Sequence, residues 1–433
     1  MLPAIMIRFK PTDLIILLVA VYFFMGHIVQ IHEVRDLISV LPFFNLGILA
    51  ASIFYLLLRS AKSKRHGLFD KRLNLFCLYL MIAFIILSII NLNAVRPAYS
   101  ISRSMTALLI LAASVILFWQ FFQVTDRRGL YGRNLLTYSL GSVLVLAVIG
   151  QLTIPSWAAG IGGVRMSGGS NPNQVAFFAF FTIFWVHYIT FKVGKWKQIN
   201  ASIYVIATVV LLWSLSRSVI LTWIVMYSVY FAGLLYIHFI RAIRGWIKKQ
   251  FLYRSLITTM TIAIFVVAIP FVLEVTDMFL QLEIIERRLS GGGGLESRIR
   301  GWEIIWPFFW ESPMTGGAGW WYSTQIMTIH STPGVQATSP HNLFVRLLTE
   351  VGIAGFIIVL AFPFFILCSL FKKLILESTN HRKFALHTFL IASIFSVFIG
   401  QFFEDRYMVG IGGVGNAIIV FILVCGLKES LSK

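Results

Sequence analysis

The sequence predicts an all-α protein: a polytopic membrane bundle of about twelve transmembrane helices, with a long outer loop that contains amphipathic helices. Three observations predict this class. Of the 433 residues, 58% are hydrophobic and only 12% are charged, which is about half the charged share of a typical soluble protein. Apolar runs near the length of a bilayer crossing recur along the chain. The segments between these runs are alternately rich and poor in basic residues.

Apolar windows of roughly 17 to 25 residues define the predicted spans. The first run is not followed by a small-residue cleavage site, so it is interpreted as a retained span and not as a signal peptide. The predicted spans are 13–31, 37–58, 73–92, 104–123, 135–153, 174–191, 199–215, 218–240, 255–275, 343–371, 385–402 and 407–427.

Basic residues set the expected orientation of the bundle. Lysines and arginines are concentrated in the segments that follow the second, fourth, sixth, eighth and tenth spans. By the positive-inside rule, these segments and both termini are expected to be cytoplasmic. The formal net charge of +19 is then explained by topology and by attraction to anionic membrane lipids, so no nucleic-acid partner is needed.

Three parts of the chain are expected. Residues 1–275 would form spans one to nine, residues 276–341 the long outer loop with interfacial helices, and residues 342–433 spans ten to twelve. The three cysteines lie far apart within apolar runs, so neither a disulfide framework nor a zinc site is indicated.

The outer loop contains the stretch "RIRGWEIIWPFFW", whose apolar residues recur at helical spacing. Tryptophans favour the membrane interface, so an amphipathic helix lying on the outer leaflet is predicted, as suits a lipid-borne substrate. The preceding "SGGGG" at 290–294 predicts a flexible hinge that could admit a long substrate. The apolar stripe consists of Trp302, Ile305, Trp306, Phe309 and Trp310.

Several polar residues on the outer side are not explained by topology. Arg217 lies in the short "SLSRS" turn between two apolar runs, where an unpaired charge is costly and therefore indicates function; the alternative is an arginine that snorkels from a helix end. The outer polar residues are Arg165, Arg217, Arg298, Arg300, His341, Glu404 and Asp405.

Arg165 precedes a glycine-rich turn and a helix start, whose backbone amides can receive an anion; an ordinary structural turn is the alternative. Arg298 and Arg300 fall at the beginning of the amphipathic helix, where a positive charge has the wrong sign for the helix dipole. Surface pairing with Glu296 or Glu303 is the alternative to a role in ligand binding.

His341 is predicted to lie at the outer membrane surface. Pro340 fixes the entry of the chain, and Asn342 begins a helix that enters the bilayer. A histidine in this place can accept a proton near neutral pH, although a lone histidine is more often structural.

Within the same helix, Arg346 and Glu350 are four residues apart and are expected to pair along the surface. Gly352 and Gly355 are expected to lie on one continuous face that allows close helix packing.

Together, four outer arginines could bind a pyrophosphate through bidentate contacts. The outer loops contain neither an Asp-x-Asp pair nor a histidine cluster with metal-ligand spacing, so no metal and no cofactor are expected. Arginine would then stabilise the charge of a departing phosphate.

These stretches resemble a known family. "HNLFVRLLTEVGIAG" resembles the His-Asn, nine residues, Gly-x-x-Gly signature of the O-antigen ligase and polymerase superfamily, and "SRIRGW" with "SPMTGGAGW" resembles its arginine and glycine segment. "LSLSRSV" and "RMSGGSNPNQVA" resemble two further family stretches. The expected number of spans and the position of the long loop also agree, so the resemblance covers most of the chain.

The resemblance implies a glycosyltransferase of the bacterial inner membrane that works on the periplasmic face, without a metal and with inversion at the anomeric carbon. An undecaprenyl-diphosphate-linked glycan would be the donor, and the lipid A-core would be the acceptor. His341 would be the general base, while Arg217 and Arg298 would stabilise the diphosphate. The spacing to Trp302 favours Arg298 over Arg300 for this role. The resemblance also implies substrate contacts at Arg165, Arg300, Asn342 and Arg346.

Ligase and polymerase share these features and differ in the acceptor; the preserved histidine signature favours the ligase. A transporter with twelve spans is less consistent with the sequence, because no span centre clearly carries the ionisable groups that an ion path needs. A glycan flippase would place its arginines along a central cavity from both faces.

Overall fold

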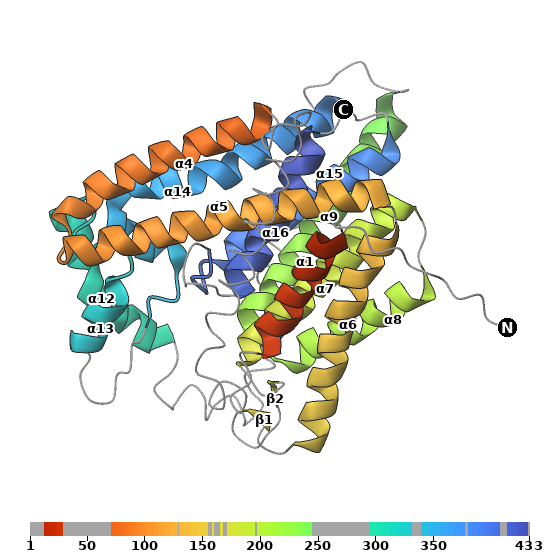
Figure 1. The fold of residues 1–433 in the computed structure, drawn as a ribbon, viewed down its shortest axis with the longest axis horizontal. Coiled ribbons are helices and arrows are strands. Elements are labelled where there is room, and N and C mark those ends of the chain that lie inside the picture. The colour runs from red at the N-terminus through yellow and green to blue at the C-terminus, as the bar shows by residue number, and fades with distance from the viewer. Residues whose placement is uncertain are drawn as a thin grey trace.

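The computed structural model is a bundle of helices (Figure 1). Twelve α-helices and one short 3-10 helix lie within the part of the chain that the structure describes. The described residues are 13–28, 71–128, 130–154, 158–159, 165–167, 171–194, 197–244, 295–330, 339–376, 380–407 and 414–431.

The helices differ in length, and the strands are only two residues each. Strands β1 (Ala158–Ala159) and β2 (Arg165–Met166) pair in antiparallel fashion. The helices are α1 (Asp13–Ile28), α4 (Lys71–Ile90), η1 (Asn91–Asn93), α5 (Pro97–Arg128), α6 (Leu130–Thr153), α7 (Pro172–Val193), α8 (Gln198–Trp213), α9 (Arg217–Arg244), α12 (Leu295–Glu311), α13 (Ser323–His330), α14 (Leu343–Leu376), α15 (His381–Gly400) and α16 (Val414–Leu431).

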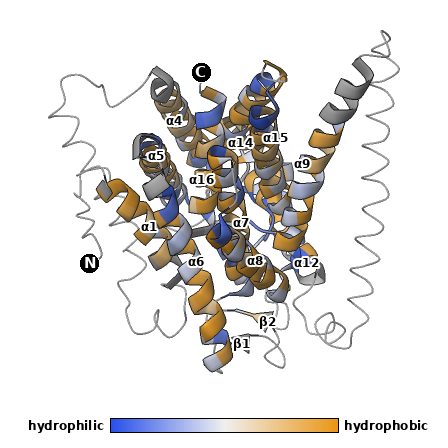
Figure 2. Cartoon of the chain, turned by 90° about the vertical axis from the view of Figure 1, so that its right-hand side faces the viewer, coloured by the Kyte–Doolittle hydropathy of each residue, from blue (hydrophilic) through white to orange (hydrophobic). Residues whose placement is uncertain are grey.

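The all-helical membrane class is confirmed by these helices. Seven of them are long and apolar enough to cross a membrane, and two shorter apolar helices accompany them in the described ranges. Figure 2 shows that hydrophobic residues cover most of the labelled helices. Ten of the predicted spans overlap described helices, while the spans predicted at 37–58 and 255–275 lie outside the described residues. The predicted total of twelve spans therefore stays a prediction.

Aromatic residues form the centre of the bundle, where α5, α7 and α16 meet. Phe421 of α16 lies against Phe118, Phe122 and Trp185, with ring centroids 5.0 to 5.4 Å apart. Buried aromatic pairs at such distances add to the stability gained from burial alone. This centre gives the surrounding helices a rigid support.

Helices α9 and α15 pack side by side in opposite directions. A Cβ on Gly400, at the end of α15, would meet Thr222 near the start of α9, and a Cβ on Gly233 would meet Thr388 near the start of α15. The start of α9 therefore lies at the same end of the bundle as the segment that follows α15.

Helices α12 and α13 lie at one end of α4, α5 and α14 (Figure 1). The predicted amphipathic helix is confirmed by α12, which buries Ile305 and exposes Trp310. The interfacial position that its tryptophans indicate stays a prediction.

The loop between α12 and α13 is joined to α14 by backbone hydrogen bonds. The amides of Gly317 and Gly319 donate to the carbonyls of Thr349 and Glu350, and the amide of Ile353 donates to the carbonyl of Pro313. These bonds are possible because α14 is broken at Gly352, whose φ of 63° and ψ of −167° belong to a region that is essentially restricted to glycine. The expected continuous face through Gly352 and Gly355 is therefore wrong.

One predicted boundary was also wrong. The span predicted at 104–123 belongs to α5, which begins earlier, at Pro97, because polar side chains on one stripe do not interrupt a helix. The span predicted at 407–427 overlaps α16, which begins at Val414, and residues 408–413 of that prediction lie outside the described residues.

A group of charges lies at the other end of the bundle. Lys192 of α7 pairs with Glu429 of α16 at 2.7 Å, and Asp126 of α5 pairs with Lys428 and with Arg133. These pairs join α5, α6, α7 and α16 on the side that the charge pattern assigns to the cytoplasm.

Candidate functional site

A short segment between α15 and α16, residues 401–407, organises the site. The Gln401 side-chain oxygen accepts hydrogen bonds from the amides of Arg406 and Tyr407, at 2.8 and 3.1 Å. The Gln401 carbonyl accepts a hydrogen bond from the amide of Leu343, the first residue of α14. The segment is thus folded on itself and fixed to the start of α14.

His341 lies just before α14 in a left-handed conformation, with a φ of 47°. Its amide donates to Ser339 Oγ at 3.4 Å, and the carbonyl of Pro340 accepts a hydrogen bond from the Trp302 indole at 2.7 Å. A non-glycine residue in this conformation is uncommon and marks a place where the surrounding structure overrides local preference. Helix α12 therefore helps to set the orientation of His341.

Asn342 caps the N-terminus of α14. Its side-chain oxygen accepts hydrogen bonds from the amides of Phe344 and Val345, at 2.9 and 3.1 Å. This confirms the predicted helix start at this residue, since a capping asparagine satisfies amides that have no partner within the helix. The side chain of Asn342 is buried.

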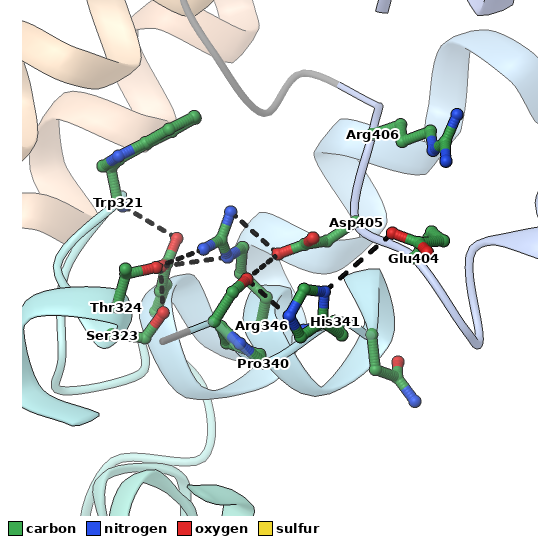
Figure 3. Close-up of polar contacts among 12 residues, drawn as sticks. Trp321, Ser323, Thr324, Pro340, His341, Arg346, Glu404, Asp405 and Arg406 are labelled. Atoms are coloured by element: carbon green, nitrogen blue, oxygen red, sulfur yellow. Dashed lines mark hydrogen bonds and ion pairs between the residues drawn. The ribbon is translucent and has the colours of Figure 1, made fainter. Parts of the chain in front are cut away.

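The imidazole of His341 faces a carboxylate. Its Nδ1 atom lies 3.9 Å from Oε2 of Glu404, as Figure 3 shows. This separation is too long for a hydrogen bond but close enough for an ion pair if the ring is protonated. The His341 side chain is 38% exposed and that of Glu404 only 14%, so a molecule can reach the ring while the carboxylate stays largely shielded.

Glu404 is held ionised by its surroundings. Its other oxygen accepts a hydrogen bond from the Asn173 side chain at 2.8 Å. Burial acts to raise the pKa of this carboxyl, but the neighbouring His341 ring and the guanidinium groups of Arg406 and Arg298 lower it overall. Arg406 is itself fixed by a hydrogen bond to the carbonyl of Asn173 and by stacking over Phe177.

Arg346 connects the segment 401–407 to α13. Its Nη1 lies 3.0 Å from Oδ2 of Asp405, and its Nη2 donates to the Thr324 hydroxyl. The same Asp405 oxygen accepts a hydrogen bond from Ser339 Oγ at 3.0 Å. Ser339 Oγ also accepts the hydrogen bond from the amide of His341. A continuous series of polar contacts therefore runs from Thr324 of α13 through Arg346, Asp405 and Ser339 to His341 (Figure 3).

The expected pairing of Arg346 with Glu350 is confirmed, with Nε 3.6 Å from Oε1. The surface setting assumed for this pair is wrong, because the two side chains are only 4% and 2% exposed. Glu350 also accepts hydrogen bonds from the Trp321 amide at 2.8 Å and from the Ser323 hydroxyl at 2.5 Å. The pair therefore joins α14 to the start of α13 and does more than support one helix.

The other predicted arginines lie in three settings. Arg298, in α12, donates to the carbonyl of Phe403 at 3.0 Å, so it lies directly beside Glu404. Arg217 is exposed at the first position of α9 and forms no hydrogen bond or ion pair within the described residues. Arg300 is exposed on α12. For Arg165 the structure describes the backbone, which lies in β2.

Four helices, α7, α9, α12 and α14, begin at this end of the bundle. Helix α7 begins beside Glu404 through Asn173, α14 begins beside His341, and α12 begins near Arg298. The packing of α9 against α15 places Arg217 at the same end. Helix N-termini carry partial positive charge and favour anions. Arg346 and Arg406 are balanced by acidic neighbours, which leaves Arg217 and Arg298 as the arginines best able to meet an added anion.

Sequence reasoning missed several contributors. Glu404 and Asp405 stood out as outer charges, but their partners Asn173 and Ser339 lie far away in the sequence, and Arg406, next to Asp405, was not among the predicted site residues. A carboxylate pair directly after an apolar run was the available signal. No group of three or more histidine, cysteine or acidic side chains within the described ranges could hold a metal.

Comparison with known proteins covers the part of the chain that carries most of this site. Residues 202–360 match the family model described as O-Antigen ligase. The match confirms the predicted resemblance to the O-antigen ligase superfamily and includes Arg217, Arg298 and His341. It indicates a multi-pass membrane enzyme with a function related to glycosyl transfer, of the O-antigen ligase or polymerase type. No curated protein matches the chain significantly.

Proposed function

We propose that the protein transfers an undecaprenyl-diphosphate-linked O-antigen glycan to the lipid A-core of lipopolysaccharide, on the periplasmic face of the bacterial inner membrane. The observation that carries the proposal is the partly exposed ring of His341, backed by the shielded Glu404 carboxylate, with Arg298 beside that carboxylate and Arg217 at the same end of the bundle. A base next to an anion site is the arrangement that transfer from a diphosphate requires.

In this reaction His341 Nε2 takes the proton of the acceptor hydroxyl. The acceptor oxygen attacks the anomeric carbon of the donor and forms the new glycosidic bond. The bond from that carbon to the diphosphate oxygen breaks, and its electron pair leaves with the diphosphate. Attack from the side opposite to the leaving group inverts the anomeric centre.

Glu404 supports the base. With Nδ1–H directed at the carboxylate, Nε2 is left as the proton acceptor, and the negative charge stabilises the imidazolium formed when the proton arrives. The distance of 3.9 Å is expected to shorten when the acceptor binds, as is common for catalytic contacts.

Arg217 and Arg298 receive the leaving diphosphate, whose developing negative charge they stabilise together with the N-termini of α7 and α9. This assignment requires no divalent metal. We assign Arg165 and Arg300 to further contacts with the substrate, and Asn342 acts by fixing the start of α14 beside the histidine. The contacts of Arg346 favour a positioning role within the site over direct contact with substrate.

The test is single-turnover transfer by purified protein, with two acceptors offered in parallel: lipid A-core and a second lipid-linked repeat. Transfer to lipid A-core supports the ligase, whereas chain elongation on the lipid-linked repeat identifies the polymerase instead. His341→Ala should reduce transfer roughly 100-fold to 10,000-fold while donor binding is retained. His330→Ala, an exposed histidine at the end of α13, is the matched control and should transfer normally. Normal transfer by His341→Ala would refute the assignment of the base.

A further inference from the structure

Two arginines at the beginning of α5 lie outside the site described above. Arg96 immediately precedes α5 and Arg103 lies within its first two turns, so with Tyr99 they follow one stripe of the helix. Arg96 is exposed and Arg103 is half-buried. Within the described part of the chain, neither has a carboxylate at ion-pair distance.

Aromatic rings hold both guanidinium groups in place. The Cζ atom of Arg96 lies 5.5 Å from the ring centroid of Tyr322, and that of Arg103 lies 5.1 Å from the ring centroid of Tyr99. The two rings meet edge to face at 5.9 Å, and Gln325 donates to the Tyr99 hydroxyl at 3.3 Å. An arginine held over a ring keeps its N–H groups free at the edge of the guanidinium plane.

This group, Arg96, Tyr99, Arg103, Tyr322 and Gln325, is called the α5–α13 patch. It lies on one side of α13, whereas Ser323 and Thr324, on the opposite side of that short helix, contact Glu350 and Arg346. A helix is about 10 Å across, so a saccharide of a few rings is long enough to extend from the patch to the surroundings of His341.

Two like charges held along one stripe repel each other unless an anion lies between or beside them. In the proposed function, the donor diphosphate binds to Arg217 and Arg298, on the side of the segment 401–407. The patch therefore provides positive charge for a different molecule. Preordered arginines are best suited to phosphate, which they contact in a bidentate manner.

We propose that the α5–α13 patch binds phosphate groups on the saccharide of the acceptor, and so places the acceptor hydroxyl at His341. This inference rests on the proposed function, which makes a lipid-borne saccharide the second substrate. The same residues would give the enzyme a preference for phosphorylated acceptors.

The experiment measures binding and transfer separately, with the full-length protein in detergent. The probes are lipid A-core and the same lipid A-core after chemical removal of its phosphates. For the double variant Arg96→Gln, Arg103→Gln, the Kd for the phosphorylated acceptor should rise about 10-fold to 100-fold. The Kd for the dephosphorylated acceptor and the Kd for the donor should stay unchanged. Lysine at both positions should restore part of the binding, because charge returns without the planar contact.

Lys372→Gln removes an exposed positive charge from the far end of α14 and serves as the matched control, with binding expected to equal that of the unmodified protein. Equal loss of binding to both acceptors in the double variant would overturn the proposal. The proposal would also be overturned if the binding defect of the double variant disappeared in nanodiscs of zwitterionic lipid. That result would identify a phospholipid headgroup as the ligand.

Binding is also measured in the His341→Ala background, where transfer is expected to be strongly reduced. Phosphate-dependent binding that survives there supports the patch by itself. If the unmodified protein binds the acceptor in this manner but transfers no glycan to it, the proposed function fails while the binding site stands.

Discussion

Glu350→Gln should release the start of α13 from α14. Glutamine has nearly the same shape but replaces one carboxylate oxygen by an NH₂ group. Both oxygens of Glu350 accept hydrogen bonds, from the Trp321 amide and the Ser323 hydroxyl, so one donor would face another donor. Hydrogen bonds to a charged group contribute about 1.5 to 3 kcal/mol each, and an unsatisfied buried donor costs about 1 to 3 kcal/mol.

Loss of one such bond, with one donor left unsatisfied, gives a local cost of about 3 kcal/mol. This corresponds to a change of roughly 100-fold in the equilibrium for local opening. The loss of negative charge beside Arg346, at 3.6 Å, adds to this cost, because the buried guanidinium then keeps only Asp405 as an acidic partner.

Hydrogen exchange of the backbone amides measures this opening directly. The Trp321 amide and the amides of α13 should exchange roughly 100-fold faster in Glu350→Gln, whereas those of α7 and α16 should keep their rates. Glu303→Gln, an exposed acid on α12, provides the matched control. Unchanged exchange of Trp321 in Glu350→Gln would show that the carboxylate does not hold α13, and the reasoning would be wrong.

Three further changes test other contacts. Arg217→Lys and Arg298→Lys should each impair donor binding and transfer while the protein still inserts in the membrane, because lysine keeps the charge but loses the two-pronged contact; normal transfer by both would exclude bidentate binding. Gly352→Ala should lower the yield of folded protein and its thermal midpoint, since the added Cβ would lie 2.5 Å from the Gly316 amide nitrogen; Ile357→Ala, at an exposed position of the same helix, is the comparison. Because its neighbours lower the pKa of Glu404, its ionised form stabilises the fold fully above the usual carboxyl range, and this contribution is lost as the pH falls through the lowered pKa. Thermal midpoints of the unmodified protein and Glu404→Gln should thus differ at pH 6 and converge towards pH 3, and a constant difference would contradict the electrostatic origin.

The sequence was informative where local chemistry decides the structure. Hydropathy located ten of the described helices, Asn342 predicted the start of α14, and the four-residue spacing of Arg346 and Glu350 predicted their contact. Each of these depends on residues within one or two helical turns.

The remaining features depend on segments that are distant in the sequence. The burial of Arg346 follows from Asp405, which lies 59 positions away, and from α13, which covers it from the other side. The break at Gly352 follows from the approach of the loop around Gly316, whereas the Gly-x-x-Gly spacing alone is equally typical of two packed helices.

The break in α14 also constrains how such proteins can be recombined. Because the loop 313–319 supplies backbone partners to residues 349–354, neither segment keeps its conformation when the other is replaced. A chimaera that exchanges this loop for that of another chain must therefore exchange residues 313–319 and 349–354 together. Exchange of residues 295–330 alone would leave the helix break without its hydrogen-bonding partners, whatever glycan the new loop could bind.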